Sequence, residues 1–298
     1  MRDYVLFADG CSNLVKEDRE RLGIKLIPMH IFIDDIKYDT TPDYEFMDSK
    51  AFYDRVRNGD RIYTSMVLPE EFEAKFEEVL KTGKDILYIG CALKLSAAVR
   101  SAFQAKDNLL KKYPDAKIEI IDSKNATYAL GMAIMDAAIR KNEGMSIEDN
   151  AKSAIDTLLN YNEIGYVDKL VYLKRAGRVS APSAFFGGLL GIKPIIVSDK
   201  EGGNAAIEKA KGKNKAFLRM IELLKEYIDL SRTTVYMNHA DCLMEAKEFA
   251  RLINENISDK LEFIYHDIEP TIGCCVGPGT IIFNFYAKKE MRNLADKK

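Results

Sequence analysis

The sequence predicts an α/β protein of two lobes, each built on a mainly parallel sheet flanked by helices. Short apolar runs alternate with amphipathic helical stretches along nearly the whole chain, which is the pattern of βαβ units. The 298 residues suffice for one large α/β domain or for two of ordinary size. With 47% hydrophobic and 30% charged residues, the chain has the composition of a protein that buries a large core.

The pattern predicts an N-terminal lobe over residues 1–163. Strands are expected where short apolar runs stand between turn residues, and helices where apolar residues repeat every three to four positions. The expected strands are 4–7, 25–33, 86–90 and 118–122. The expected helices are 69–80, 95–113, 126–141 and 146–160, the first of them with Pro69 in its first turn.

A C-terminal lobe is expected over residues 164–298, because the character of the sequence changes near residue 163. The expected strands are 170–173, 192–197, 233–238, 261–264 and 280–286, with a polar hairpin over 198–205. The expected helices are a glycine-rich stretch over 183–191, then 213–229 and 241–257. Residues 270–279 are expected to form a loop, and the tail from residue 287 a frayed helix.

Charge and hydropathy exclude several classes of protein. A formal net charge of −2 argues against nucleic-acid binding, which requires Lys and Arg concentrated on one face. No apolar run approaches the roughly 20 residues that span a bilayer. The first residues lead into a short strand and not into the apolar core of a signal peptide. The protein is therefore expected to be cytoplasmic, without an integral membrane segment.

The five cysteines are odd in number and scattered, so they predict no disulfide framework, and CxxC metal spacing is absent. The adjacent Cys274 and Cys275 could bind a soft metal or become oxidised. The preferred interpretation is that they are two small thiols in a tight loop.

The usual signatures of an enzyme are missing. GxSxG, GxxxxGK[ST] and a GxGxxG turn after a strand do not occur, and three histidines are too few and too separated for a metal cluster. His239 with Asp241 could be a base and its orienting carboxylate, but Asp241 as the N-cap of the next helix is the simpler interpretation. No catalytic residue, metal or cofactor is therefore expected. The alternative is a serine-dependent acyl hydrolase or transferase that uses Ser96 with His239 or His266.

Hydroxyl side chains stand at the ends of predicted strands. Thr64 and Ser65 precede the helix that starts at Pro69, and Ser96 stands at the start of the next long helix. Ligands of open α/β sheets bind beyond the carboxyl ends of the strands, where helix N-termini offer N–H groups to an anion. These residues therefore suit an anionic head group. Ordinary helix caps remain the alternative for each hydroxyl taken alone.

These residues, together with others in order along the chain, resemble the motifs of the DegV family of fatty-acid-binding proteins. The resemblance covers almost the whole chain. The matching segments are Asp9–Leu14, Tyr38-Asp39, Thr64-Ser65 with Pro69–Phe72, Leu95-Ser96 with Ser101-Ala102, Asp122–Ala126, Leu173 through Arg178-Val179 to Gly191–Ile195, and Gly277–Gly279.

The resemblance implies a lipid carrier and not an enzyme. One long-chain fatty acid would lie in a buried tunnel of the N-terminal lobe, and the C-terminal lobe would close over its carboxylate. In bacteria that have a fatty-acid kinase, such proteins present the bound acid for phosphorylation, so a kinase is the implied partner. By the same resemblance the ligand-binding residues are Thr64, Ser65, Ser96, Ala97, Arg178, Cys275 and Gly277, with Thr64 and Ser96 on the carboxylate.

The chain departs from the family pattern in three places. Ala92-Leu93 replaces a frequent Ser-Ser, and Ala97-Ala98 replaces the Gly-Thr that follows the serine. Cys275 stands where the family usually has a histidine, two residues before Gly-Pro-Gly. The loss of that imidazole bears more on phosphorylation of the ligand than on its binding.

Overall fold

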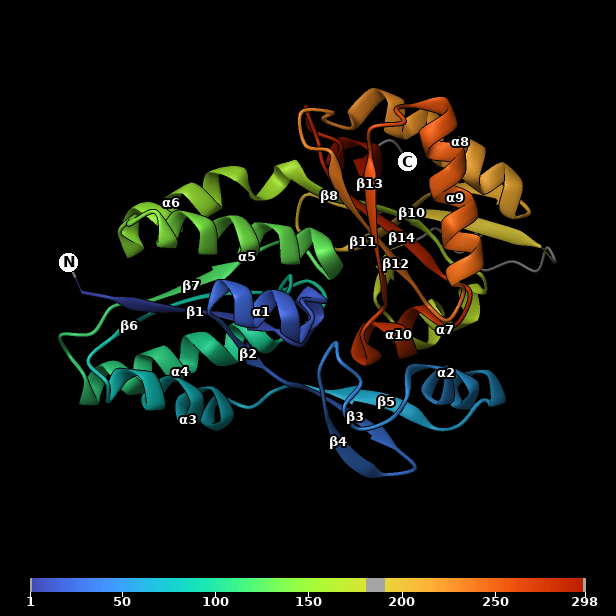
Figure 1. The fold of residues 1–298 in the computed structure, drawn as a ribbon. Helices are drawn as coiled ribbons and strands as arrows, with labels where there is room; N and C mark the ends of the chain where they lie inside the picture. Colours follow the sequence, from blue (N-terminus) through green and yellow to red (C-terminus); the bar gives the residue numbers. More distant parts are fainter. Residues whose placement is uncertain (1, 181–190, 297–298) are drawn as a thin grey trace.

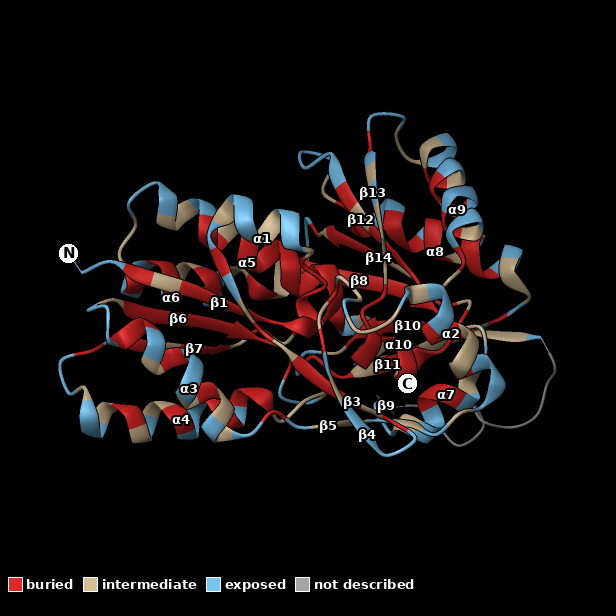
Figure 2. Cartoon of the chain, turned by 60° about the horizontal axis from the view of Figure 1, so that its bottom comes forward, coloured by how far each residue is buried: buried red, intermediate tan, exposed pale blue. Residues whose placement is uncertain are grey.

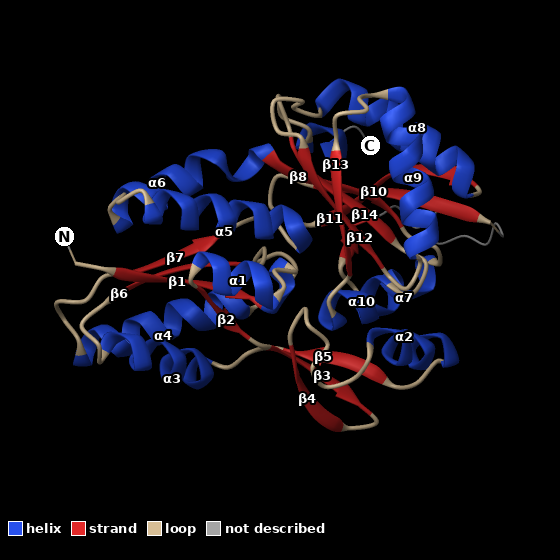
Figure 3. Cartoon of the chain, in the orientation of Figure 1, coloured by secondary structure: helices blue, strands red, loops and turns tan. Residues whose placement is uncertain are grey.

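The computed structural model describes residues 2–180 and 191–296, and the described chain contains three β-sheets (Figure 1). Sheet A has the strand order β2-β1-β6-β7, sheet B has β4-β3-β5, and sheet C has β13-β12-β14-β8-β10-β11-β9. Helices pack against the sheets, so the predicted α/β fold class is confirmed (Figure 3).

Sheet A is parallel throughout, as the sequence predicts for the N-terminal lobe. Its strands are β1 (Tyr4–Asp9), β2 (Ile24–Ile27), β6 (Asp85–Gly90) and β7 (Ile118–Asp122). Every residue of β6 is buried, because both faces of the sheet are covered by helices (Figure 2).

The helices around sheet A form two layers. α1 (Lys16–Leu22), α5 (Thr127–Asn142) and α6 (Ile147–Thr157) lie on one face, and α3 (Pro69–Leu80) and α4 (Ala98–Lys112) on the other (Figure 1). Short 3₁₀ turns follow β1 and α6, at η1 (Gly10–Ser12) and η2 (Leu158–Asn160). α5 packs closely on η1: a Cβ atom on Gly131 would lie 2.7 Å from the carbonyl oxygen of Ser12. The small residues of α5 therefore serve close packing.

Sheet B is antiparallel and small. It contains β3 (Met29–Ile33), β4 (Ile36–Thr40) and β5 (Ile62–Ser65), and α2 (Ser49–Asn58) lies beside it (Figure 3). The prediction of one strand over 25–33 is wrong, because the chain breaks at Pro28 into β2 in sheet A and β3 in sheet B. Proline has no N–H for a ladder bond, which makes it a natural break between strands.

Sheet C is mixed, so the prediction of a mainly parallel second sheet is wrong. Its strands are β8 (Tyr161–Tyr166), β9 (Val179–Ser180), β10 (Ile192–Ser198), β11 (Asn204–Lys211), β12 (Thr234–His239), β13 (Glu262–Asp267) and β14 (Ile281–Tyr286). Among its described strand pairs, β12–β13 and β9–β11 are parallel and the other four are antiparallel. A tight hairpin joins β10 to β11, whereas parallel neighbours need a crossover. Helices α8 (Lys213–Tyr227) and α9 (Leu243–Asn256) pack on this sheet (Figure 1).

Two short helices replace other expected structures. α7 (Leu170–Ala176) occupies the expected strand, since a short apolar run does not distinguish strand from helix, and Gly177 ends it at a φ of 67°. α10 (Pro270–Val276) occupies the expected loop. Pro270 stands in its first turn, and the carboxylate of Glu269 accepts bonds from the N–H groups of Thr271 and Ile272. Residues 183–190 of the expected glycine-rich helix lie outside the described residues.

The final 3₁₀ turn, η4 (Arg292–Asp296), carries a fully buried arginine. The guanidinium of Arg292 donates to the carbonyl oxygens of Lys124 (2.6 Å), Tyr161 (2.9 Å) and Asp199 (3.1 Å), and to Oδ1 of Asn125 (2.5 Å). This one side chain therefore joins the loop after β7, the start of β8 and the hairpin after β10.

The expected boundary between residues 163 and 164 falls inside β8. The division into two lobes at that point stays a prediction. No helix in the described part of the chain is long and apolar enough to cross a membrane.

Candidate functional site

A cavity of about 160 Å³ lies where the ends of β1, β5 and β6 meet α10 and sheet C. Its wall is mostly apolar and includes Met29, Leu95, Leu173, Ile272, Val276 and Ile282. Polar groups enter it from separate elements, among them Thr64, Ser96, Thr127, Glu163, Arg178, Asn204 and Thr271. An apolar cavity with a few convergent polar groups is the usual form of a small-ligand site.

Six of the seven residues expected at the ligand line this one cavity: Thr64, Ser65, Ser96, Ala97, Arg178 and Cys275. The seventh, Gly277, is not part of the wall. It is buried against the ring of Tyr172 with a φ of 77°, and it ends α10. The structure thus brings together residues that are more than 200 positions apart in the chain (Thr64 and Cys275), while their roles toward a ligand stay predictions.

Thr64 and Ser65 are the last two residues of β5. Antiparallel pairing with β3 fixes their position, with Thr64 opposite Ile31 and Ser65 opposite His30. Both side chains are half-buried at the edge of the cavity. The chain then leaves the sheet toward α3, so both hydroxyls stand at a strand end, as the sequence predicts.

Ser96 stands just before α4. Its Oγ accepts a hydrogen bond from the N–H of Ala98 at 3.2 Å, although Ser96 is not the N-cap residue of α4. Accepting that bond leaves the hydroxyl hydrogen available for a ligand. Ala97 is the N-cap residue of α4, and the positive end of this helix dipole faces the cavity wall that Ser96 and Ala97 form.

Arg178 is exposed and follows the left-handed Gly177 that ends α7. Its guanidinium donates to the carbonyl oxygens of Ala176 (2.6 Å) and Leu95 (3.5 Å). The second bond holds the cation beside the turn that carries Ser96.

A buried polar network reaches the cavity from the far side, and sequence reasoning missed it. The Thr127 hydroxyl oxygen lies 2.7 Å from Oε2 of Glu163 and 2.5 Å from Oδ1 of Asn284, and Ser198 donates to Oε1 of Glu163. Burial raises the pKa of Glu163. Thr127 directly follows the Asp122–Ala126 motif, which could have pointed to it, whereas nothing in the sequence singles out Glu163.

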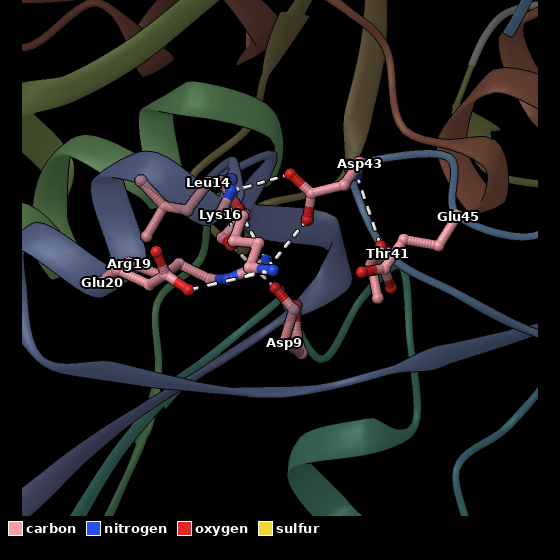
Figure 4. Close-up of polar contacts among 9 residues, drawn as sticks. Asp9, Leu14, Lys16, Arg19, Glu20, Thr41, Asp43 and Glu45 are labelled. Atoms are coloured by element: carbon pink, nitrogen blue, oxygen red, sulfur yellow. Dashed lines mark hydrogen bonds and ion pairs between the residues drawn. The ribbon is translucent and has the colours of Figure 1, made fainter. Parts of the chain in front are cut away.

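The turn after β1 is held in place by buried and half-buried charges. Asp9 is fully buried, accepts bonds from the Tyr88 hydroxyl (2.7 Å) and the N–H of Cys91 (2.8 Å), and has a pKa raised by burial. Nearby, Arg19 binds Asp43 at 2.8 Å and thereby joins α1 to the loop after β4 (Figure 4). These contacts position the turn whose Cys11 lines the cavity; Cys91 also lines it.

The histidines proposed for a hydrolase do not line this cavity. His239 pairs with Asp267 on the neighbouring strand, with Nδ1 and Oδ1 3.1 Å apart. His266 stacks on the ring of Tyr128, and burial lowers its pKa. Ser96 is therefore not accompanied at the cavity wall by either histidine.

Asp241 does not cap α9, and that expectation is wrong. The N-cap residue is Cys242, and the Asp241 carboxylate instead binds Arg57 at 2.6 Å. Asp241 has a φ of 50°, a conformation that a short polar side chain tolerates in a turn. Among residues 2–180 and 191–296, no three His, Cys, Asp or Glu side chains gather as a metal site.

Comparison with known proteins places this geometry in a family. Residues 4–288 match the family described as "Uncharacterised protein, DegV family". A DegV domain-containing protein of Clostridium perfringens is 34% identical over 290 residues, which are 96% of this chain and 98% of the relative. Another, from Streptococcus pyogenes, is 31% identical over 283 residues, covering 93% of this chain and 96% of the relative.

Solved structures agree in fold. DegV of Bacillus subtilis, described as a fatty acid binding protein, has a TM-score of 0.82 at 27% identity and covers 97% of this chain and 100% of its own. A DegV family protein of Thermus thermophilus, described by its fatty acid binding, has a TM-score of 0.80 at 26% identity and covers 96% and 100%.

Proposed function

The chain belongs to the DegV family, and on that basis we propose that it binds one long-chain fatty acid in the cavity lined by Thr64 and Ser96. The observation that carries the proposal is the gathering of six of the seven residues expected at the ligand around one apolar cavity. The solved relatives of Bacillus subtilis and Thermus thermophilus are described as binding fatty acids, which supports the same ligand class here.

The carboxylate would lie between β5 and α4. The hydroxyls of Thr64 and Ser96 would donate to it, and the positive end of α4 favours an anion there. Each hydrogen bond to a charged group contributes about 1.5–3 kcal/mol. Arg178 adds a cation at the same wall, although its exposure lets solvent screen the charge.

The acyl chain would supply most of the affinity. About 14 buried methylenes at roughly 0.8 kcal/mol each amount to about 11 kcal/mol before the costs of association. The cavity of about 160 Å³ resembles in size one that holds benzene (about 150 Å³), so a longer chain needs its wall to move apart into a tunnel. Met29 and the thiols of Cys11 and Cys91 are adaptable wall groups on the side toward sheet A.

A carrier role toward a fatty-acid kinase is the finer part of the proposal. This role is consistent with a cavity wall that offers hydroxyls and a cation and, in the described part of the chain, no serine paired with a histidine. Arg178, exposed at the cavity, is suited to contact the acyl head group or a docked kinase. A cytoplasmic location is proposed with it, since the kinase reaction consumes ATP.

Native mass spectrometry of the purified protein tests the ligand. A carrier is expected to retain the mass of one long-chain fatty acid, which organic extraction removes and added acid restores. The proposal would be overturned if the purified protein carries no lipid and, although shown to be folded, does not bind added fatty acid. Serine-dependent turnover of acyl-CoA would favour the hydrolase alternative instead.

A further inference from the structure

Two adjacent cysteines on α10 stand at the wall of the cavity. The Sγ atoms of Cys274 and Cys275 are 3.9 Å apart. Cys274 is buried and directs its thiol toward the carbonyl oxygen of Thr271 at 3.3 Å, whereas Cys275 is partly exposed and lines the cavity. One thiol is thus accessible to small molecules that enter the cavity, and the other lies directly behind it.

The surroundings give the two thiols opposite acidities. The hydrogen bond from Cys274 lowers the pKa of Cys275 against the effect of burial, and the positive charges of Arg178 and Arg175 lower it further. The pKa of Cys274 is raised well above its usual value by its neighbour and by burial. A thiolate beside a protonated thiol is the arrangement of a redox-sensitive cysteine with its resolving partner.

We propose that Cys274 and Cys275 form a reversible redox site, in which hydrogen peroxide oxidises Cys275 and Cys274 closes a disulfide that reshapes the cavity. The Cys275 sulfur attacks one peroxide oxygen; an S–O bond forms, the O–O bond breaks, and hydroxide leaves and becomes water on protonation. The Cys274 sulfur then attacks the sulfenic acid; the S–S bond forms, and the second oxygen leaves as water with the thiol proton. The two cysteines lose two electrons, which reduce the peroxide to two waters.

The disulfide does not fit the helix that carries it. Consecutive Cα atoms are about 3.8 Å apart, below the roughly 4.4–6.8 Å that disulfides prefer. Because the trans peptide bond fixes this separation, the disulfide closes only as a strained ring, and that strain is expected to twist open the last turn of α10, next to Gly277, while Glu269 holds the first turn through its cap. A strained disulfide is readily reduced again, which makes the site reversible.

Opening this turn changes the ligand site, because α10 supplies Thr271, Ile272, Cys275 and Val276 to the cavity wall. The same helix packs against α7 and against β3 and β5 of sheet B (Figure 1). Oxidation is thus expected to weaken fatty-acid binding; this part of the inference rests on the proposed function.

The remaining thiols are internal controls. Cys11, Cys91 and Cys242 are buried, and their pKa values are all raised, that of Cys242 to about 12 through burial. They are expected to react far more slowly than Cys275, because the thiolate is the reactive form.

The chemical test treats the reduced full-length protein with hydrogen peroxide at neutral pH. Intact mass should fall by two hydrogen atoms, and peptide mapping should locate the bridge at residues 274–275. Cys274→Ser should instead accumulate a sulfenic acid at Cys275, trapped with dimedone, and Cys275→Ser should lose the rapid oxidation. The control Cys242→Ser should behave as the unchanged protein. A bridge at another pair, or rapid oxidation in Cys275→Ser, would overturn the inference.

The functional test measures fatty-acid affinity before and after peroxide. Affinity is expected to fall by about tenfold on oxidation and to return with dithiothreitol, with no such response in Cys275→Ser. An unchanged affinity in protein whose bridge is confirmed would refute the coupling to the cavity. If the reduced protein binds no fatty acid at all, the proposed function fails, whereas the mass and dimedone measurements still decide the redox site.

Discussion

The hydroxyl oxygen of Thr127 lies 2.7 Å from the carboxyl oxygen Oε2 of Glu163, and the same hydroxyl is 2.5 Å from the amide oxygen of Asn284. A threonine hydroxyl has one hydrogen and cannot donate to both oxygens. A protonated Glu163 resolves the conflict, because it donates to Thr127 while Thr127 donates to Asn284. Burial, which raises the pKa of Glu163, favours that state.

Glu163→Gln is therefore expected to preserve the network. A group whose folded-state pKa is raised adds stability at low pH and loses it as pH rises through the folded pKa. The variant should thus match the parent at low pH and exceed its thermal stability as pH rises through the raised pKa of Glu163. Thr127→Val is the contrasting variant, expected to cost about 1–3 kcal/mol because the buried hydroxyl of protonated Glu163 loses its acceptor. Thermal unfolding from pH 5 to 9 checks both, and a Glu163→Gln protein weaker than the parent at pH 9 would mean that Glu163 is charged.

Thr64→Ala and Ser96→Ala are each expected to weaken fatty-acid binding about 10- to 100-fold, since each would remove a proposed hydrogen bond to the carboxylate worth about 1.5–3 kcal/mol. Titration calorimetry on delipidated protein measures the change, and the melting temperature should move little. Ser231→Ala, in an exposed turn outside the cavity, is the matched control. Unchanged affinity in both variants would remove these hydroxyls from the site.

Gly277→Ala is expected to destabilise the protein severely although Gly277 does not line the cavity. Its φ is 77°, and an added Cβ would lie 2.1 Å from the ring of Tyr172, a contact that requires the chain or the ring to shift. Gly23→Ala, with a φ of 67° and open space around the added atom, should cost only about 1 kcal/mol. Denaturant unfolding compares the two; equal losses would show that backbone conformation alone matters at position 277.

Glu269, the buried N-cap of α10, predicts a pH dependence of stability. Burial raises its pKa to about 7, with Asp9 adding repulsion, so protonation stabilises the fold, and that stability is lost as pH rises from the unfolded value near 4.5 through 7. The difference between the folded and unfolded pKa values corresponds to a loss of about 3 kcal/mol of stability at most. Glu269→Gln should flatten this decline, measured by urea unfolding between pH 5 and 8. Because Asp9 and Glu163 also have raised pKa values, part of the decline in stability with rising pH should remain in the Glu269→Gln variant.

Arg292→Leu is expected to cost about 3–5 kcal/mol, because the guanidinium is fully buried and its four acceptors would lose its hydrogen bonds. Of these acceptors, the carbonyl oxygen of Asp199 keeps a bond from the N–H of Gly202. Arg251→Leu, on the exposed face of α9, should change stability little, because solvent screens its ion pairs. Chemical denaturation compares the two variants. Similar losses of stability in both would contradict the stabilising role of the hydrogen bonds that Arg292 makes.

Much of the fold follows from local patterns in the sequence. The alternation of apolar runs and amphipathic segments predicts β1, β6 and β7 of sheet A and the helices α3 to α6, because buried strands and amphipathic helices alternate there. The short helix α1 was not among the expected helices. Sheet B was missed, since β4 and β5 are short and partly exposed and carry little periodic signal. The mixed order of sheet C depends on contacts between distant strands such as β8 and β14, which no local pattern records.

The residues of the candidate site also divide into those that the sequence predicts and those that it does not. Thr64 and Ser96 could be expected at the cavity because strand ends and helix starts are visible in the sequence. Glu163 and Thr127 could not, because their pairing joins residues 36 positions apart through the packing of α5 on β8. Gly277 belongs to a recognisable motif, yet its conformation serves the end of α10 and not the cavity wall.

The hydrogen bonds of Arg292 have a consequence for how the polypeptide folds on the ribosome. Its acceptor at Lys124 is translated 168 residues earlier, and that of Tyr161 131 residues earlier. Until Arg292 has left the exit tunnel, those carbonyl groups have no guanidinium to bind, so this part of the packing forms only after residue 292 has emerged. Chains that stop before residue 292 should therefore be cleaved by proteases more readily than chains that include it.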